Sequence, residues 1–189
     1  MRKISLSLFL ALLAALLLSS CASQTVFLKK DYDFTRIKRV AVLPFNSSVF
    51  SNESGTMVSE LFIKYLLRAG YNVVERAELD AIMKEYQLSQ SSLYNSEQVK
   101  QFKLSGIDAI VTGTITKNLP EQNLYDNGYP RFIAAQAGIT CRMIDVETGE
   151  ILWAGADVYD GMTQQTAFDY LTSTIVNQLS SDMEKAMTK

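Results

Sequence analysis

Apolar and polar residues change their spacing along the chain, and each change marks a predicted element. An apolar run over residues 40–45, Val-Ala-Val-Leu-Pro-Phe, has a proline, Pro44, near its end. Such a run is typical of a strand buried on both faces. Four further strands are predicted over residues 71–74, 107–116, 131–146 and 150–159. The glycine turn Glu147-Thr148-Gly149-Glu150 joins the last two strands into a hairpin.

The segments between these strands show the three- and four-residue spacing of amphipathic helices. Val58, Leu61 and Phe62 begin one apolar stripe, and Gly70 ends that helix. Shorter helices are predicted around residues 79–86 and from a capping box at Asn95 and Gln98 up to Gly106, and a long one over 163–186. Residues 117–129 show no regular pattern. The order of elements predicts a single α/β domain, in which helices pack against a mixed β-sheet of about five to six strands.

Each predicted element has an apolar face that must be covered, so we expect these faces to share one core. Its expected members are Val40, Val42, Leu61, Phe62, Ile110, Ile144 and Trp153.

The N-terminus has the order of regions found in secretory signals. Arg2 and Lys3 precede an apolar segment from Ile4 to Leu18, and the stretch Leu18-Ser19-Ser20-Cys21 follows. Bacterial lipoproteins carry their acylated cysteine at such a position. An uncleaved anchor is the alternative, but about 15 apolar residues fall short of the roughly 20 needed to cross a bilayer. Ordinary secretion without acylation is a third possibility.

This pattern divides the chain into three parts. Residues 1–20 are expected to be removed as a lipoprotein signal peptide, and Cys21 is expected to carry the lipid, including palmitate. Residues 21–36 are interpreted as a short tether, and residues 37–189 as the globular domain. Ala22, rather than aspartate, follows the cysteine, which resembles Gram-negative signals for transfer to the outer membrane. We therefore expect a membrane-anchored protein on the periplasmic face of the outer membrane.

Composition excludes several classes of function. Loss of Arg2 and Lys3 changes the formal net charge from −2 to −4, so nothing indicates a nucleic-acid partner. The chain has no histidine, which excludes Ser-His-Asp and Cys-His catalysis. It also lacks phosphate-binding glycine motifs and CxxC pairs. Cys141 lies in an apolar alternation and is interpreted as a small buried hydrophobe. We expect no enzyme activity, cofactor, metal site or small-molecule substrate.

The loop from Asn46 to Gly55 is polar except for Val49 and Phe50. These two side chains either form a local packing lid or make an exposed contact with a partner or another copy.

Several motifs together resemble the CsgG-type bacterial lipoproteins. They are the apolar run Val40–Phe45, the stretch Val73-Val74-Glu75-Arg76, the strand ending Val111-Thr112-Gly113, and the hairpin from Asp145 to Gly155. They occur in order across almost the whole expected mature chain. The resemblance implies an α/β domain and a non-enzymatic assembly or accessory role, with a protein partner or a homo-oligomer.

Two more specific roles remain as alternatives. The first is a secretion component of a curli-like system, but membrane-spanning hairpins need strands of about 9 to 11 residues, and the segment Asn118–Pro130 is too short and polar. The second is an LpoB-like activator of a peptidoglycan synthase, for which the tether over 21–36 is short. The resemblance therefore favours an accessory module without a pore of its own.

Overall fold

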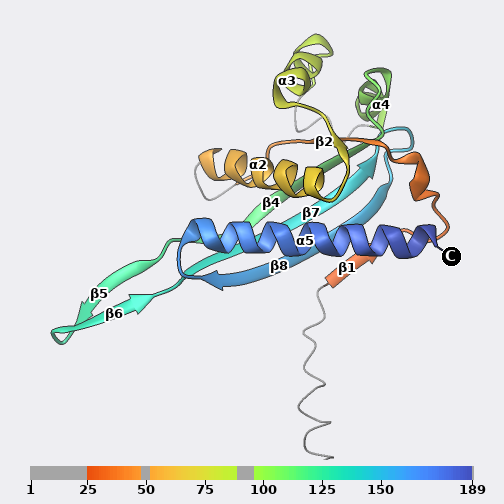
Figure 1. Ribbon diagram of the computed structural model, residues 1–189. Coiled ribbons are helices and arrows are strands. Elements are labelled where there is room, and N and C mark those ends of the chain that lie inside the picture. Colours follow the sequence, from red (N-terminus) through yellow and green to blue (C-terminus); the bar gives the residue numbers. More distant parts are fainter. Residues whose placement is uncertain (1–24, 48–51, 89–95, 189) are drawn as a thin grey trace, which may run out of the picture.

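The computed structural model describes residues 25–47, 52–88 and 96–188. Its strands form a six-stranded sheet in the order β1-β8-β7-β4-β2-β3 and a separate two-stranded hairpin, β5-β6 (Figure 1). The bounds are β1 Thr25–Leu28, β2 Arg39–Val42, β3 Asn72–Val73, β4 Ala109–Leu119, β5 Gln122–Asp126, β6 Tyr129–Ile133, β7 Ala135–Asp145 and β8 Ile151–Gly161. The predicted α/β fold with a mixed sheet of five to six strands is confirmed.

The sheet is mixed because β2 pairs in parallel with both β3 and β4, whereas β4, β7, β8 and β1 pair antiparallel. The predicted hairpin β7-β8 is present. Its turn contains Gly149 at φ +74°, a left-handed conformation that glycine adopts without steric cost. The amide of Gly149 donates to the carbonyl oxygen of Asp145 at 2.8 Å.

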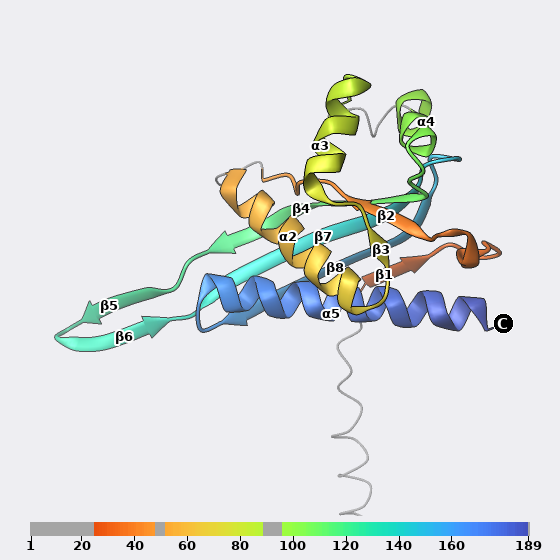
Figure 2. The same cartoon turned by 45° about the horizontal axis from the view of Figure 1, so that its top comes forward.

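Helices cover both faces of the sheet (Figure 2). The helices α2 (Asn52–Arg68) and α5 (Gln164–Met187) pack on one face, and α3 (Arg76–Glu85) and α4 (Ser96–Leu104) on the other. A short 3-10 helix, η1 (Phe34–Arg36), precedes β2. α5 begins at a capping box, in which Thr163 and Thr166 exchange side-chain to backbone hydrogen bonds.

The expectation of one shared core is wrong, because the sheet separates two cores. Val40, Val42, Phe62 and Trp153 lie in the core beneath α2 and α5, with Leu61 partly buried at its margin. Ile110 and Ile144 lie in the core beneath α3 and α4. Neighbouring residues of a strand point to opposite faces, so an apolar run such as β2 contributes to both cores.

The N-terminal segment differs from the expected tether. Residues 25–28 form β1, which pairs antiparallel with Trp153 to Ala156 of β8. Phe34 of η1 is only 2% exposed. β1 and η1 are thus packed into the domain, although they lie within the range 21–36 expected as a tether.

The segment expected to be irregular also differs. Residues 117–133 form the end of β4 and the hairpin β5-β6, so the single strand predicted over 131–146 is divided into β6 and β7. Figure 1 shows this hairpin extending beyond the end of the six-stranded sheet.

Candidate interaction surface

The residues singled out from the sequence lie outside the described part of the chain. These are the predicted acylation site Cys21 and the two apolar loop residues Val49 and Phe50. Their roles stay predictions. The structure describes the residues next to them: Thr25 begins β1, and Asn46 makes a parallel bridge to Thr114.

The hairpin β5-β6 closes through the two residues Asn127 and Gly128. Both have positive φ angles, +50° and +83°, as a type I′ turn requires. Asp126 faces Tyr129 and Tyr125 faces Pro130 across the two strands. Pro130 is tolerated in β6 because β5 is the only strand that β6 pairs with among the described elements.

Polar contacts fix the base of the hairpin to the helices. Asn118 is only 6% exposed; its amide donates to the hydroxyl of Ser54 in α2 at 3.0 Å, and its carbonyl oxygen accepts from the side chain of Gln164. The carboxylate of Glu121 accepts the backbone N–H of Gln164 at 3.0 Å. These bonds hold the root of the hairpin against the start of α5.

Beyond that base, every residue of β5 and β6 is exposed. Partners across an antiparallel pair project on the same side, so Tyr125 and Phe132 share one face, and Leu124, Tyr129 and Ile133 share the other. The exposed fractions of the two tyrosines are 80% and 76%. The hairpin therefore presents apolar side chains to solvent on both faces.

A second surface feature is an open groove of about 660 Å³ between the β1 edge of the sheet and α5. Val26 and Leu28 line it from β1, Asp157 from β8, and Tyr170, Gln178 and Asp182 from α5. Asp182 is held in place, since it accepts hydrogen bonds from the indole N–H of Trp153 at 3.1 Å and from Gln178 at 2.7 Å.

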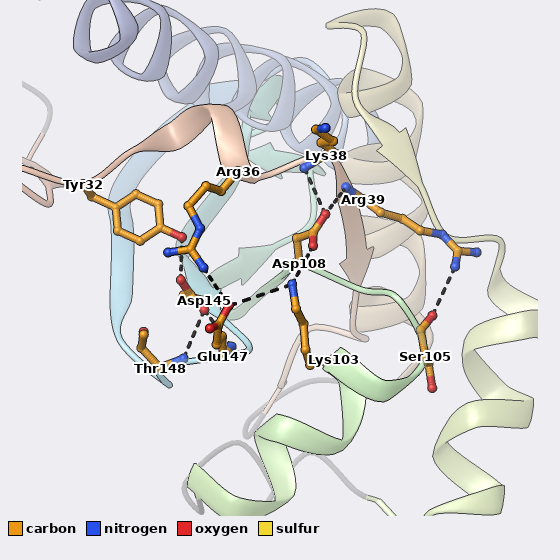
Figure 3. A network of polar contacts seen from close by, with 10 residues as sticks. All are labelled: Tyr32, Arg36, Lys38, Arg39, Lys103, Ser105, Asp108, Asp145, Glu147 and Thr148. Carbon is orange, nitrogen blue, oxygen red and sulfur yellow. Dashed lines mark hydrogen bonds and ion pairs between the residues drawn. The ribbon is translucent and has the colours of Figure 1, made fainter.

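At the end of the sheet opposite to the hairpin β5-β6, a network of polar contacts joins the N-terminal segment to the turn between β7 and β8 (Figure 3). Asp145 accepts from the hydroxyl of Tyr32 and from the backbone N–H groups of Glu147 and Thr148. Arg36 donates to the carboxylate of Glu147 at 2.7 Å. The turn is thereby fastened to the segment between β1 and β2.

Asp108 is the third carboxylate of this network, after Asp145 and Glu147. It accepts backbone N–H groups of Lys38 and Arg39 at 3.1 and 2.9 Å, and the ammonium group of Lys103 at 3.0 Å. Partial burial alone raises the pKa of Asp108, but the bonds from Arg39, Lys103 and Lys38 outweigh it and hold the pKa below its usual range. Burial and the bond to Asp145 raise the pKa of Tyr32. These contacts connect the N-terminal segment, the start of β4 and the β7-β8 turn.

Two further features bear on chemistry. Within the described residues, no group of three or more acidic, cysteine or histidine side chains is arranged to hold a metal ion. Cys141 is 5% exposed, which confirms its interpretation as a buried hydrophobe, and burial raises its pKa to about 12.

None of the helices described by the structure is both long enough and apolar enough to span a bilayer.

The hairpin was missed from the sequence although a signal for it is present. Asn-Gly, flanked by strand-forming residues, is the strongest short-range indication of a two-residue hairpin turn. Here Leu124 and Tyr125 precede Asn127-Gly128, and Tyr129 follows. The polar residues and the two prolines of the segment obscured that signal.

Comparison with known proteins finds one matching family. The model of the family described as "Curli production assembly/transport component CsgG" matches residues 30–128, just over half of the chain. No curated protein sequence is significantly similar to this chain.

Solved structures share the fold at low sequence identity. The PelC dodecamer from Paraburkholderia phytofirmans is 13% identical with a TM-score of 0.55, covering 80% of this chain and 96% of that one. Lipoprotein GNA1162 from Neisseria meningitidis is 19% identical with a TM-score of 0.52, covering 75% and 96%. The hypothetical protein CT253 from Chlamydia trachomatis is 12% identical with a TM-score of 0.52, covering 77% and 98%. Because the family model matches more than half of the chain, and the observed fold agrees with it, this chain belongs to the CsgG family.

Proposed function

We propose that this protein is a lipid-anchored accessory subunit on the periplasmic face of the outer membrane. It acts without catalysis, by contacting partner proteins or further copies of itself in an assembly or transport complex. The observation that carries the proposal is the hairpin β5-β6, whose apolar side chains are exposed on both faces. Exposed apolar patches on a folded domain mark interaction sites.

Family membership and fold support this role. The matching family model is that of a curli assembly and transport component. The PelC structure with the same fold is a dodecamer. A domain whose relatives assemble in this way fits a role in which contact, rather than chemistry, is the output.

The position of β1 supports attachment close to the membrane. Only residues 22–24 separate Cys21 from β1, and the four steps from Cys21 to Thr25 span at most about 14 Å. A lipid on Cys21 therefore keeps the β1 edge of the sheet next to the bilayer surface. Two or three acyl chains are enough for stable anchoring. Such a short connection disfavours a role that requires reach across the periplasm, such as activation of a peptidoglycan synthase.

Acylation is tested by growing cells with labelled palmitate. Label is expected in the wild-type protein and in Cys141→Ala, the matched control, and absent from Cys21→Ala. Equal labelling of the Cys21→Ala protein contradicts the proposed anchor.

Contact is tested by crosslinking intact cells and identifying the linked peptides by mass spectrometry. We expect crosslinks from the hairpin to another copy or to an envelope protein. If the wild-type protein, at its natural abundance, is recovered only as an uncrosslinked monomer, the proposed role is wrong.

A further inference from the structure

We propose that the hairpin β5-β6 of one copy docks into the groove between β1 and α5 of a second copy. This inference deepens the proposed function and rests on its self-contact branch. Each copy of the chain supplies both sides of the interface: the projecting hairpin and the open groove.

The hairpin needs a covering surface. An isolated two-stranded hairpin is only marginally stable in water, and additional strands or a packed face normally support it. Here neither face is packed, since all residues of β5 and β6 are exposed. Tyr125 and Phe132 on one face, and Leu124, Tyr129 and Ile133 on the other, supply apolar area that a partner would bury.

The chemistry of the hairpin tip favours a protein surface over the interior of a bilayer. The turn carries Asp126 and Asn127 at the end that would enter the lipid first. A carboxylate is among the least favourable groups inside a membrane. With five residues in each strand, the hairpin is also shorter than the 9 to 11 residues of a membrane-crossing strand.

The groove matches the hairpin in length. Tyr170, Thr174, Gln178 and Asp182 line it at four-residue intervals along one flank of α5. Twelve residues of helix extend for about 18 Å. A five-residue strand extends for about 17 Å. Val26 and Leu28 form the apolar wall opposite α5, against which aromatic side chains of the hairpin would pack.

Charge is complementary between the two features. Asp157 and Asp182 line the groove, and none of the described residues that line it is basic. The hairpin carries Arg131, whose side chain is 64% exposed and lies 4.0 Å from Asp126, at the outer limit of an ion pair. In a docked arrangement, Arg131 turns to the acidic side of the groove. Such pairing fixes the register of an interface.

The arrangement of the chain makes this a contact between copies. The hairpin extends beyond the end of the sheet, whereas the groove lies along the β1 edge, so the hairpin is directed away from the groove of its own chain (Figure 1). An interface between two different surfaces is heterologous, and repeating it generates a ring or a filament.

The test uses the full-length, lipidated protein in intact cells. Two differently tagged versions are coexpressed, one with Tyr125→Cys in the hairpin and one with Thr174→Cys in the groove, and a short bismaleimide is added. We expect a crosslinked dimer that carries both tags. A chain with both substitutions is expected to give a ladder beyond the dimer. The native Cys141 is buried and provides no competing site.

Controls separate this geometry from its alternatives. Tyr125→Cys expressed alone is expected to give no dimer. Hairpin-to-hairpin dimers without a mixed-tag product contradict the proposal, because they indicate a symmetric contact. Crosslinks from Tyr125→Cys to a cysteine of a different protein, without a mixed-tag product, also contradict it.

A charge exchange tests the register. Arg131→Glu is expected to reduce the mixed-tag product several-fold, and Asp157→Arg in the groove-bearing copy is expected to restore it. Lys84→Glu, on the exposed surface of α3, is the matched control and should leave the product unchanged. A loss that Asp157→Arg fails to restore, in proteins with unchanged melting temperatures, overturns the assigned pairing.

Failure of this inference is distinguishable from failure of the proposed function. The size of the detergent-solubilised complex is measured for the same variants by native mass spectrometry. A multi-subunit complex that forms without hairpin-to-groove crosslinks overturns the docking geometry and leaves the accessory role standing. Absence of both any complex and any crosslinked partner contradicts the proposed function itself.

Discussion

At Gly113, β4 passes close to the backbone of β7 and to the ring of Phe45. A Cβ atom there would lie 2.1 Å from the carbonyl oxygen of Thr140 and 2.4 Å from the ring of Phe45. Both distances are far below normal contact, and the first involves backbone that cannot move aside. The glycine of the Thr-Gly motif is therefore required by packing.

We expect Gly113→Ala to lower the free energy of unfolding by about 1–3 kcal/mol or more, as other overpacking changes do. Urea unfolding of the mature protein measures the effect. Thr116→Ala, at an exposed position of the same strand, is the control and should change the stability by no more than about 0.5 kcal/mol. Equal stability of Gly113→Ala and the wild type would show that β4 and β7 separate easily at this point.

Asp108 gives the fold a defined dependence on pH. Its folded pKa lies below the ordinary value of 3.8, so the carboxylate stabilises the fold fully at pH values above that value. The contribution is lost as the pH falls through 3.8 and then through the lower folded pKa. We expect Asp108→Asn to cost about 1.5–3 kcal/mol at pH 7, the range for hydrogen bonds to charged groups.

The measurement compares urea unfolding of the wild type and Asp108→Asn from pH 7 down to pH 3. The difference between them should shrink at the acidic end. Asp80→Asn on the exposed surface of α3 is the control and should show no such trend. A difference that stays constant over this range would show that the charge of Asp108 is not responsible.

Cys141 should be chemically silent in the folded protein. Burial raises its pKa to about 12 and leaves the side chain inaccessible, and only the thiolate is an effective nucleophile. We expect no reaction with a maleimide at pH 7 and rapid reaction in denaturant, measured by mass. The exposed Tyr125→Cys variant is the positive control. Modification of Cys141 at the rate of that control would contradict its buried position.

At the scale of elements, α2 is held to the sheet by an aromatic pair. Phe62 is fully buried, and its ring stacks on Phe45 with centroids 4.6 Å apart. We expect Phe62→Ala to cost about 3–5 kcal/mol, the typical value for truncating a buried phenylalanine. Leu67→Ala, half exposed on the same helix, should cost much less. A loss below about 1 kcal/mol for Phe62→Ala in urea unfolding would contradict this packing.

The elements also show what can be predicted from sequence and what cannot. The apolar run of β2, the turn at Gly149 and the stripe of α2 each carry a local signal, and these elements were predicted correctly. Apolar periodicity shows that a residue is buried but not on which side of the sheet, so Val40 and Ile110 were placed in the same core. Their separation depends on pairing between distant strands.

The candidate interaction surface was predicted least well. The hairpin β5-β6 lacks a buried face, so the alternation on which strand prediction relies is absent, and only Asn127-Gly128 indicates it. The groove combines β1 with β8 and α5, which lie far from β1 in the sequence, so no local pattern indicates the groove. Val49 and Phe50, expected to form either a packing lid or an exposed contact, lie outside the described residues, and their role stays a prediction.

For the whole molecule, we expect that the protein alone forms no transmembrane pore. The strands β5 and β6 have five residues each, which is too short to cross the hydrocarbon core. Purified protein should therefore give no channel conductance in planar bilayers. The curli secretion channel, incorporated under the same conditions, is the positive control. Stable unitary current steps from this protein would contradict the expectation.

The pairing of β1 with β8 also constrains the time at which the domain can be completed. Leu28, near the start of the expected mature chain, pairs with Trp153, near its end. Contacts between such distant segments form late, because the intervening chain must first be brought together. In a chain exported with its N-terminus first, the six-stranded sheet remains incomplete until the last strand has crossed the inner membrane. Residues 25–28, among the first of the expected mature chain to emerge, therefore cannot take their place in the sheet until β8 is available.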